Sequence, residues 1–446
     1  MRPTSRVRDA IDHYCELLSG KHGRSTREQL IEATARFNLR YFDKRPLCIV
    51  LRPNFIESHA YAESCRAATL VNRAIRHFTE RLLADRKRAV DAGIPEYLQP
   101  ILDLDRRHGE PPAFARLDGI LDEDGTIKFI EYNSEPGSIL DADTIDAVFS
   151  AMPIARDFAQ RFSFRTVPAL PLAFDALYDR HRQHGKHGAP CIGVVRSTAD
   201  ASFDRVLLWL GSQGCRVMIA RLAEFNLANG LLTVEKRPID IVLAPWRMFF
   251  DPPPEAKPLL EALSTGAVRA FRGLSRGLTG SAKVLFDLLS DPTQWDGLDN
   301  ECTEALAAHV PWTRRVRQCT TSWRGGKIDL VPFVAEHRAD LVLKPSGSLG
   351  GEGVVLGWTV DDARWRVAVE KALARPHVVQ ERVVSPTELY PVLTDESFTL
   401  EERQSDFNPF VWNGERAEGH FIRATRSGVH NLSGGSSLLA KWILEN

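Results

Sequence analysis

Two short segments, 113–121 and 126–133, alternate apolar and polar residues on either side of an Asp-Gly turn. An Asp-Gly turn between alternating segments is typical of a β-hairpin. Residues i and i+2 of a strand point to the same face of a sheet. One face of this hairpin is therefore expected to bring together four polar side chains, those of Arg116, Asp118, Glu131 and Asn133.

The types of these four side chains indicate phosphate chemistry. Carboxylate and amide oxygens, as on Asp118, Glu131 and Asn133, are hard ligands that Mg²⁺ prefers when it also binds phosphates. The guanidinium of Arg116 suits an oxygen of a phosphoryl group in transfer. Alternation alone would instead predict the solvent-facing side of a half-buried hairpin. The residue types favour a site, because an exposed hairpin face usually carries Thr, Lys and Glu.

A glycine-rich segment at 341–357 could bind an anion. An apolar strand is expected to end at Lys344, and four glycines follow within nine residues. Glycines let successive backbone N–H groups surround an anion, and the lysine supplies charge. The segment lacks the Walker pattern G-x-x-x-x-G-K-[ST], and a strand rather than the helix of a Rossmann fingerprint follows it. A turn without a ligand is the alternative interpretation.

Hydrophobic periodicity predicts the elements that must position these residues. Residues 1–44 and 60–92 are expected to be helical, and 47–56 is expected to be a buried strand. Strand, helix and strand follow one another within 190–300, so this part is expected to form a small open α/β domain with parallel strands. The chain from 301 onwards combines strands with short helices.

Two further segments carry clusters of polar residues. HVVQERVVSP at 377–386 is expected to be an edge strand or a half-buried strand. DRHRQHGKHGA at 179–189 is polar and contains glycines, so it is expected to be a linker. Its histidines are expected to be solvated rather than to bind metal, as is usual for such tracts.

The composition excludes several classes of protein. With 446 residues, 43% of them apolar, the chain is expected to form roughly two to four domains. Its 57 Lys and Arg residues balance 58 Asp and Glu residues, which gives no general attraction to nucleic acid or to an anionic membrane. No apolar stretch approaches the about 20 residues that span a bilayer. The seven scattered cysteines contain no C-x-x-C pair, so a cytoplasmic protein is predicted.

In this order, the hairpin, the lysine–glycine segment and the strand at 377–386 resemble a known family. They are similar to the ATP-grasp ligases in the circularly permuted arrangement of glutathionylspermidine-synthase-like proteins. In ordinary ATP-grasp chains the lysine, glycine loop and adenine segment precede the metal-binding carboxylates, whereas here the hairpin comes first. Segment 273–291 resembles the family's lead-in to its ATP-binding part, and 407–437 resembles its closing strands and Gly-Gly loop. The resemblance covers roughly residue 110 to the end.

The resemblance implies a mixed α/β and α+β fold that is ATP-grasp-like and circularly permuted. Together with the predicted elements, it divides the chain into four parts. These are a mainly helical region at 1–100, the metal-binding hairpin part of the core at 101–165, a small open α/β domain of the pre-ATP-grasp type at 166–300, and the ATP-binding part of the core at 301–446.

By position, the resemblance also implies a role for each residue. Mg²⁺ would be held by Asp118, Glu131 and Asn133, and Arg116 would be the catalytic residue at the transferring phosphoryl group. The residues expected to bind ATP are Lys344 at the phosphates, Gly347, Ser348, Gly350, Gly351 and Gly353 in a lid, Gln380, Glu381 and Val383 at the adenine, and Glu388 at the ribose. A second basic residue at the phosphates is expected at Arg314 or Arg315, with Lys327 as a further candidate. The substrate carboxylate would bind Arg423, Arg426 and Asn431, which could equally form a cationic strand edge.

The activity that the resemblance implies is that of an ATP-dependent carboxylate–amine ligase. Such an enzyme uses ATP and Mg²⁺, forms an amide through an acyl-phosphate intermediate and releases ADP and phosphate. Its partners would be small carboxylates and amines of the amino-acid, peptide or polyamine type, and a homodimer is the default oligomer.

Two alternatives to this activity are kept. One is a nucleotide-binding protein of the same fold without ligase activity. The other is a serine hydrolase that uses Ser275, because residues 273–277 match the G-x-S-x-G pattern. The hydrolase is disfavoured, since a nucleophile elbow needs a buried strand directly before the serine.

Overall fold

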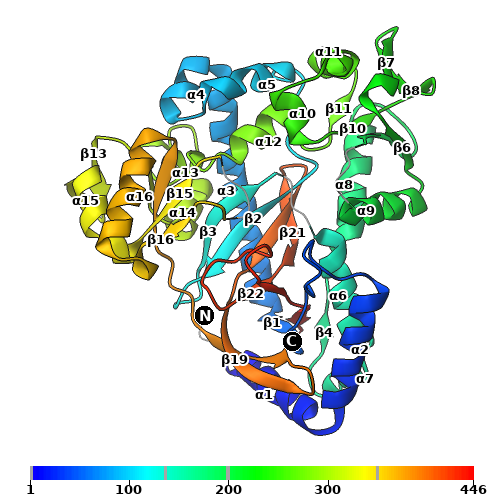
Figure 1. Cartoon of the computed structure of the whole chain (residues 1–446), viewed down its shortest axis with the longest axis vertical. Coiled ribbons are helices and arrows are strands. Elements are labelled where there is room, and N and C mark those ends of the chain that lie inside the picture. Colours follow the sequence, from blue (N-terminus) through cyan, green and yellow to red (C-terminus); the bar gives the residue numbers. More distant parts are fainter. Residues whose placement is uncertain (1–3, 135–137, 197–200, 348–350, 446) are drawn as a thin grey trace.

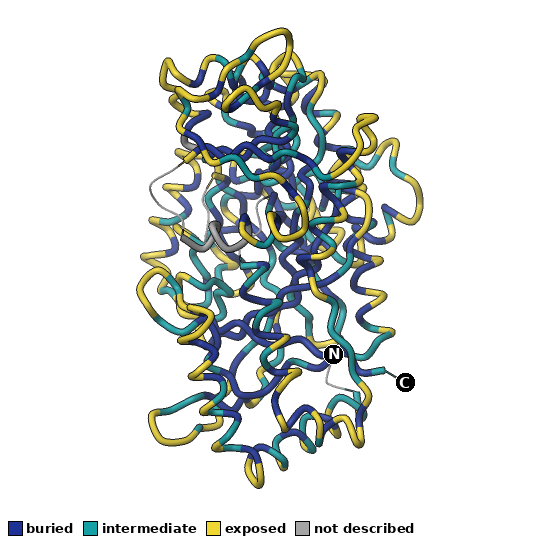
Figure 2. The backbone as a smooth tube through the Cα atoms, turned by 90° about the vertical axis from the view of Figure 1, so that its right-hand side faces the viewer, coloured by how far each residue is buried: buried dark blue, intermediate teal, exposed yellow. Residues whose placement is uncertain are grey.

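The structure is a computed structural model that describes residues 4–134, 138–196, 201–347 and 351–445 (Figure 1). A central sheet and the long helix α3 (Ser58–Ala84) run through the molecule, with a lobe of helices and strands on either side (Figure 1). Figure 2 shows buried residues along the whole length of the molecule, with the exposed residues gathered at loops and on outward-facing helix surfaces. No described helix combines the length and the apolarity that crossing a lipid bilayer requires.

Helices dominate the first hundred residues, as predicted. α1 (Ser5–Leu17) and α2 (Gly23–Arg36) flank a π-helical turn at Leu18–His22. After α3, the chain enters α4 (Arg86–Ala92), which ends at Gly93 in a left-handed conformation. Glycine is common at this position because it has no Cβ to clash.

The strand expected at 47–56 is much shorter than predicted. β1 is confined to Asn54–Glu57 and pairs in parallel with β24 (Lys441–Leu444) near the end of the chain. Upstream of Pro53, the backbone bonds to separate partners, as where Leu51 donates to the carbonyl of Pro391. Val50 forms one isolated antiparallel bridge with Val392, so the apolar character of 47–53 reflects burial with a single bridge rather than a continuous strand.

The predicted hairpin forms half of a four-stranded antiparallel sheet with the order β21-β20-β2-β3. Its strands are β2 (Phe114–Leu121) and β3 (Ile127–Asn133). β20 (Asn408–Trp412) and β21 (Arg416–Phe421) complete the sheet, and α3 packs against them. The hairpin is confirmed, and its neighbours come from the opposite end of the chain.

A small parallel sheet with the order β11-β10-β5-β6 lies to the upper right in Figure 1. Its strands are β5 (Cys191–Val195), β6 (Arg216–Ala220), β10 (Ile241–Leu243) and β11 (Arg269–Ala270). α9 (Ala201–Ser212) connects β5 to β6, which pair in parallel. The predicted strand–helix–strand unit is therefore confirmed.

The prediction of a linker at 179–189 is wrong for the first half of this segment. α8 (Ala169–Gln183) continues through this part, and Arg180 and His181 are buried. Arg180 forms an ion pair with Glu110 at 3.2 Å, which ties α8 to the segment before β2. The sequence alone could not predict this ion pair, because the residue type of Arg180 does not show whether its side chain is buried or solvated.

A third sheet, with the order β12-β17-β15-β16, lies to the left in Figure 1. Its antiparallel strands are β12 (Thr313–Arg315), β15 (Leu341–Pro345), β16 (Val355–Leu356) and β17 (His377–Glu381). α15 (Leu330–Glu336) and α16 (Asp362–Ala374) pack on it, and Trp365 is fully buried between them. The described residues confirm the predicted strand on each side of the glycine-rich segment.

The remaining elements connect these sheets. A C-terminal sheet contains β18 (Glu388–Leu393), β19 (Phe398–Ser405), β22 (Arg423–Thr425) and β23 (Ser437–Leu438). The other α-helices are α5 (Gln99–Leu104), α6 (Ile139–Ala151), α7 (Pro153–Phe158), α10 (Trp246–Phe250), α11 (Lys257–Thr265), α12 (Leu274–Gly280), α13 (Leu285–Leu289) and α14 (Asn300–His309). The other strands are β4 (Phe164–Arg165), β7 (Phe225–Ala228), β8 (Leu231–Val234), β9 (Arg237–Pro238), β13 (Thr320–Trp323) and β14 (Gly326–Asp329).

Gly119 fixes the position of the hairpin relative to the C-terminal strands. The pairing of β2 with β3 shifts its register between Asp118 and Gly119. Gly119 donates to Asn408 Oδ1 at 3.1 Å and accepts from the N–H of Phe407 at 2.8 Å. A Cβ at this position would lie 2.8 Å from the carbonyl oxygen of Phe407 and 2.9 Å from the side chain of Ile127. Only glycine fits here, and it holds the neighbouring Asp118 in place.

Replacing Gly119 by Ala should destabilise the protein by about 1–3 kcal/mol, the usual cost of overpacking. The carbonyl oxygen of Phe407 belongs to the backbone, so it yields less readily than the end of a flexible side chain. Denaturant unfolding measures the effect, with Gly211→Ala in α9 as the matched control, because a Cβ there meets nothing within 4 Å. Equal loss of stability in the two variants would contradict the close packing at Gly119.

Candidate functional site

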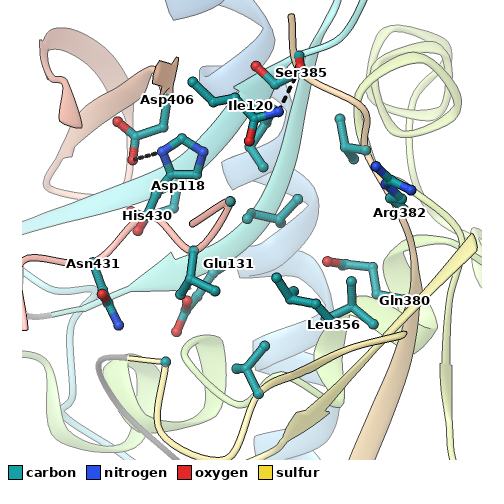
Figure 3. Close-up of a pocket in the computed structure, with 18 of the residues that line it drawn as sticks. Asp118, Ile120, Glu131, Leu356, Gln380, Arg382, Ser385, Asp406, His430 and Asn431 are labelled. Carbon is teal, nitrogen blue, oxygen red and sulfur yellow. Dashed lines mark hydrogen bonds and ion pairs between the residues drawn. The ribbon is translucent and has the colours of Figure 1, made fainter. Parts of the chain in front are cut away.

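A cavity of about 430 Å³ lies where the hairpin meets the sheet of β15 and β17 and the loop after β22 (Figure 3). Six described lining residues are cationic: Arg116, Lys283, Lys344, Arg382, Arg423 and Arg426. Four are anionic: Asp118, Glu131, Glu381 and Asp406. The excess of positive charge suits a polyanionic ligand.

The hairpin brings its four predicted polar side chains together. In the antiparallel register Arg116 lies opposite Asn133 and Asp118 lies opposite Glu131, and all four residues line the cavity. The predicted convergence on one face is therefore confirmed. The face is not a solvated surface, because Arg116 is 8% exposed and Asp118 is 6% exposed.

Asp118 is enclosed by two guanidinium groups. Arg116 donates to Oδ1 at 2.6 Å and to Oδ2 at 3.0 Å, and Arg423 donates to Oδ2 at 2.8 Å. Burial would raise the pKa of Asp118, but Arg116 and Arg423 hold it well below its usual range. Both carboxylate oxygens accept hydrogen bonds from guanidinium groups, so Asp118 would have to exchange these partners to bind Mg²⁺, and its role as a metal ligand stays a prediction.

The three C-terminal residues predicted to bind substrate all line the cavity, but their surroundings differ. Arg423 is buried and also donates to Asp406 Oδ2 at 2.7 Å, so it joins two carboxylates of the protein. Arg426 has a side chain that is 70% exposed, and its nearest carboxylate is that of Glu401 at 3.7 Å. Asn431 accepts a hydrogen bond from the N–H of Gly434 through Oδ1 at 2.8 Å. Arg426 is therefore the cation of this group most accessible to a ligand.

Lys344 lies on β15, and its ammonium group reaches the hairpin. Its Nζ donates to Gln380 Oε1 at 2.6 Å and to the carbonyl of Ile130 in β3 at 3.3 Å, across 214 residues of chain. Lys344 is 7% exposed, and burial lowers its pKa to about 8. The lysine of the glycine-rich segment and the hairpin thus face the same cavity, as predicted.

Lys283 is a cavity lysine that the sequence analysis missed. It follows α12, is 6% exposed, and forms an ion pair with Glu131 at 2.9 Å between Nζ and Oε1. The available signal was its place within 273–291, the segment that resembles a family lead-in. No local pattern marks a single lysine there as a ligand.

The basic residues that were predicted to bind phosphates together with Lys344 lie outside the described lining of the cavity. Arg314 donates to Thr321 Oγ1 at 2.8 Å, and Arg315 donates to the carbonyl of Asp91 at 2.8 Å. Lys327 is exposed on β14. None of these three residues lines the cavity, so the structure does not bring them to Lys344, and the assignment of a second phosphate-binding residue to Arg314 or Arg315 stays a prediction.

The chain leaving β17 forms one wall of the cavity, with Gln380, Glu381 and Val383 among the lining residues. Next to them, the guanidinium of Arg382 stacks on Trp358 at 4.1 Å from the ring centroid. The backbone N–H of Glu381 donates to the carbonyl of Trp312 at 2.8 Å, so it is already engaged.

Glu388 lies away from this wall. Its carboxylate pairs with the buried Arg52, and it lines a neighbouring cavity instead. The structure therefore does not support the predicted contact of Glu388 with a ribose. Nothing in the sequence indicated that the chain leaves the wall of this cavity after Ser385.

The described glycines of the segment after Lys344 lie on both sides of β15. Gly351 lines the cavity with φ +78°, and a Cβ there would approach Asn431 Nδ2 to 2.8 Å. Gly347 and Gly353 line a groove on the opposite side, with Leu343. Ser348 and Gly350, which were predicted to belong to the lid, lie outside the described residues.

Besides Asp118, the hairpin offers two oxygen donors to the cavity, the carboxylate of Glu131, which pairs with Lys283, and the amide of Asn133. Among the described residues, no three His, Cys, Asp or Glu side chains are grouped so as to hold a metal ion. Mg²⁺, however, is usually bound by one or two carboxylates together with phosphate oxygens of a substrate. Glu131 and Asn133 therefore fit Mg²⁺ that arrives with a nucleotide.

Ser275 does not occupy a nucleophile position. It lies within α12, is fully buried, and its backbone N–H donates to Asp105 Oδ1 at 3.0 Å. A nucleophile elbow instead presents its serine at the exposed tip of a turn between strand and helix. The structure therefore does not support a serine hydrolase based on Ser275.

Replacing Asp118 by Asn should destabilise the protein by about 3–5 kcal/mol, because two buried guanidiniums would lose their shared counter-charge. Denaturant unfolding measures the effect. Asp124→Asn, in the exposed turn of the same hairpin, is the matched control and should change stability little. If both variants unfold at the same denaturant concentration as the unmodified protein, Asp118 does not have this structural role.

Comparison with known proteins identifies the fold. No protein-family model matches the chain, and no curated protein matches it. A solved structure of a glutathione synthetase-like effector (GSS30) from Globodera pallida, in its apo form, is 13% identical, with a TM-score of 0.60 over 99% of this chain and 98% of that chain. An ATP-grasp ligase, PsnB, in complex with a minimal precursor, is also 13% identical over 58% of this chain and 90% of that one, but its TM-score of 0.31 is too low to establish a shared fold. The likeness to the effector structure therefore shows that the chain shares its mixed α/β fold.

Proposed function

We propose that this protein is an ATP-dependent carboxylate–amine ligase with a circularly permuted ATP-grasp fold. One observation carries the proposal: Lys283, Lys344 and Arg116, from three distant segments, face one cavity that also holds the carboxylate of Glu131 and the amide of Asn133 on β3. The likeness to a glutathione synthetase-like structure supports the fold part of the proposal. The chemistry rests on the residues of the cavity, because one fold can serve many functions.

The residues of the cavity suit a triphosphate bound with a hard cation. Lys283 and Lys344 would bind phosphate oxygens, and Arg116 would approach the phosphoryl group that is transferred. Glu131 and Asn133 would hold Mg²⁺, which when bound neutralises charge on the phosphates. The base of the nucleotide would lie along the wall from Gln380 to Val383, beside the stacked Arg382 and Trp358.

The proposed reaction has two steps. First, an oxygen of the substrate carboxylate attacks the γ-phosphorus of ATP, ADP leaves, and an acyl phosphate forms. Second, the amine nitrogen attacks the carbonyl carbon, the bond from that carbon to the phosphate oxygen breaks, and an amide and phosphate are released. Arg426, the most exposed cation of the cavity wall, would bind a substrate carboxylate that does not react.

The protein's contribution to this reaction is mainly electrostatic. The transferred phosphoryl group carries negative charge on several oxygens, and fixed cations in a water-poor cavity stabilise it without reorganising. Arg116 is such a fixed cation, because Asp118 holds its guanidinium at 2.6 Å and 3.0 Å. No side chain has to act as a covalent nucleophile.

Replacing Glu131 by Gln should lower ADP formation by about 100-fold or more, because the cavity loses the carboxylate proposed to bind Mg²⁺. The measurement is phosphate release from MgATP with a panel of amino acids and dipeptides, with products identified by mass spectrometry. Glu123→Gln, in the exposed turn of the hairpin, is the matched control.

The same panel separates the ligase from its alternative. The ligase releases ADP only when a carboxylate and an amine are both supplied. A nucleotide-binding protein without ligase activity would bind MgATP but release no ADP with any pair. Unchanged turnover in Glu131→Gln would contradict the assignment of Glu131 to Mg²⁺.

The affinity for MgADP should fall as the pH is raised from 7 to 9. Burial lowers the pKa of Lys344 to about 8, so the ammonium loses its charge, and its attraction for phosphate, as the pH rises through that value. Calorimetric titration of Lys344→Met should show weaker binding at pH 7 and a flatter pH dependence. Lys327→Met, at an exposed position on β14, should behave like the unmodified protein. An unchanged pH profile in Lys344→Met would exclude Lys344 from the phosphate site.

A further inference from the structure

His430 is a buried histidine in the wall of the cavity that the proposed phosphoryl transfer does not use. It lies in the segment between β22 and β23, and its side chain is 6% exposed. Its Nδ1 faces Asp406 Oδ2 at 3.8 Å and has no closer hydrogen-bond partner (Figure 3). The ring thus lies inside the cavity with one nitrogen directed at a carboxylate.

The carboxylates of the described cavity wall are all engaged by cations. The pairs are Asp118 with Arg116, Glu131 with Lys283, Asp406 with Arg423, and Glu381 with Arg324, at 2.6 to 2.9 Å. A carboxylate held by a guanidinium or an ammonium is a weak base, because the cation stabilises its ionised form. His430 is therefore the group of the described wall best suited to accept a proton.

The charges that face His430 come from three elements. Asp406 lies between β19 and β20, Arg423 on β22 and Asp118 on β2. Burial and the charge of Arg423 lower the pKa of His430, and Asp406, Asp118 and a hydrogen bond to the backbone of Arg423 only partly offset these effects. The ring is therefore neutral near pH 7. The neutral ring carries one proton, so its other nitrogen has a lone pair.

The proposed second step needs such a proton acceptor. An aliphatic amine has a pKa near that of lysine, about 10.4, so it is largely protonated at neutral pH. Only the unprotonated amine has a lone pair with which to attack the acyl phosphate. In the absence of a base, the small unprotonated fraction limits the rate.

We propose that His430 is the general base that takes a proton from the attacking amine, with Asp406 orienting its ring; this inference rests on the ligase function proposed above. The protonated amine gives one proton to the unprotonated ring nitrogen of His430, and the free amine nitrogen then forms the bond to the carbonyl carbon. As the bond from that carbon to the phosphate oxygen breaks, a second proton leaves the nitrogen for the departing phosphate, and the amide remains. The imidazolium then returns the proton to the departing phosphate or to water. Charge and atoms balance without any further reactant.

Replacing His430 by Asn tests this role when two nucleophiles are compared. Hydroxylamine is largely unprotonated at neutral pH and traps an acyl phosphate without a base. His430→Asn should lose about 100-fold in turnover with the amine found in the panel, the usual scale of general-base catalysis. Hydroxamate formation from the same carboxylate, MgATP and hydroxylamine should change less than about threefold. The loss with the amine should shrink as the pH approaches the pKa of that amine.

Two variants control for misfolding. His59→Asn, on an exposed helix surface, should keep both reactions. His430→Gln should reproduce the selective loss, and binding of MgADP should persist in both His430 variants.

Each other outcome overturns the inference. An equal loss of amide and hydroxamate would show a structural role, and unchanged amide formation would show that no base is needed at 430. Absence of turnover by the unmodified protein across the panel would remove the ligase function and this inference with it. Selective loss in His430→Asn is the one result that supports the general base.

Discussion

The structure depends on opposite charges that are buried together at the junction of distant segments. Asp118 binds Arg116 from its own strand and Arg423 from 305 residues later in the chain, and Arg423 in turn binds Asp406. Removing such groups from water costs several kcal/mol per ion unless the partners and their hydrogen bonds are complete. The arrangement is therefore stable only when β2 and the C-terminal strands pack against each other. The same requirement places the functional cations, because Arg116 is held by this network and Lys283 pairs with the neighbouring Glu131.

The parts of the fold and of the site that could be predicted are those that a short segment of sequence determines. The hairpin followed from strand alternation and an Asp-Gly turn, but the register shift between Asp118 and Gly119, which sets Asp118 opposite Glu131, did not. Lys344 and the strand after it followed from a short apolar segment and its glycines. The pairing of Asp118 with Arg423 could not be predicted, because nothing local distinguishes a carboxylate that binds metal from one that binds arginine. Lys283 was missed for a related reason, since its position is set by the packing of α12 and not by a motif around it.

The corrections also share a physical cause. The segment 47–53 is apolar because it is buried, but Pro53 and its separate hydrogen-bond partners prevent a long strand. Arg180 and His181 looked like linker residues, yet they are buried at the end of α8, where Arg180 pairs with Glu110. Glu388 was placed by its distance along the chain, whereas Arg52 holds it outside the cavity. In each case a tertiary contact decided the outcome, and composition or spacing gave no indication of it.

The central claim is that a triphosphate lies between the lysines and the hairpin, and a crystal structure grown with Mg²⁺ and a non-hydrolysable ATP analogue tests it most directly. The phosphates should lie within hydrogen-bond distance of the Nζ atoms of Lys283 and Lys344, with the metal ion bound by Glu131 and Asn133. A nucleotide bound at another place in the molecule, or the absence of any bound nucleotide at saturating concentration, would contradict it.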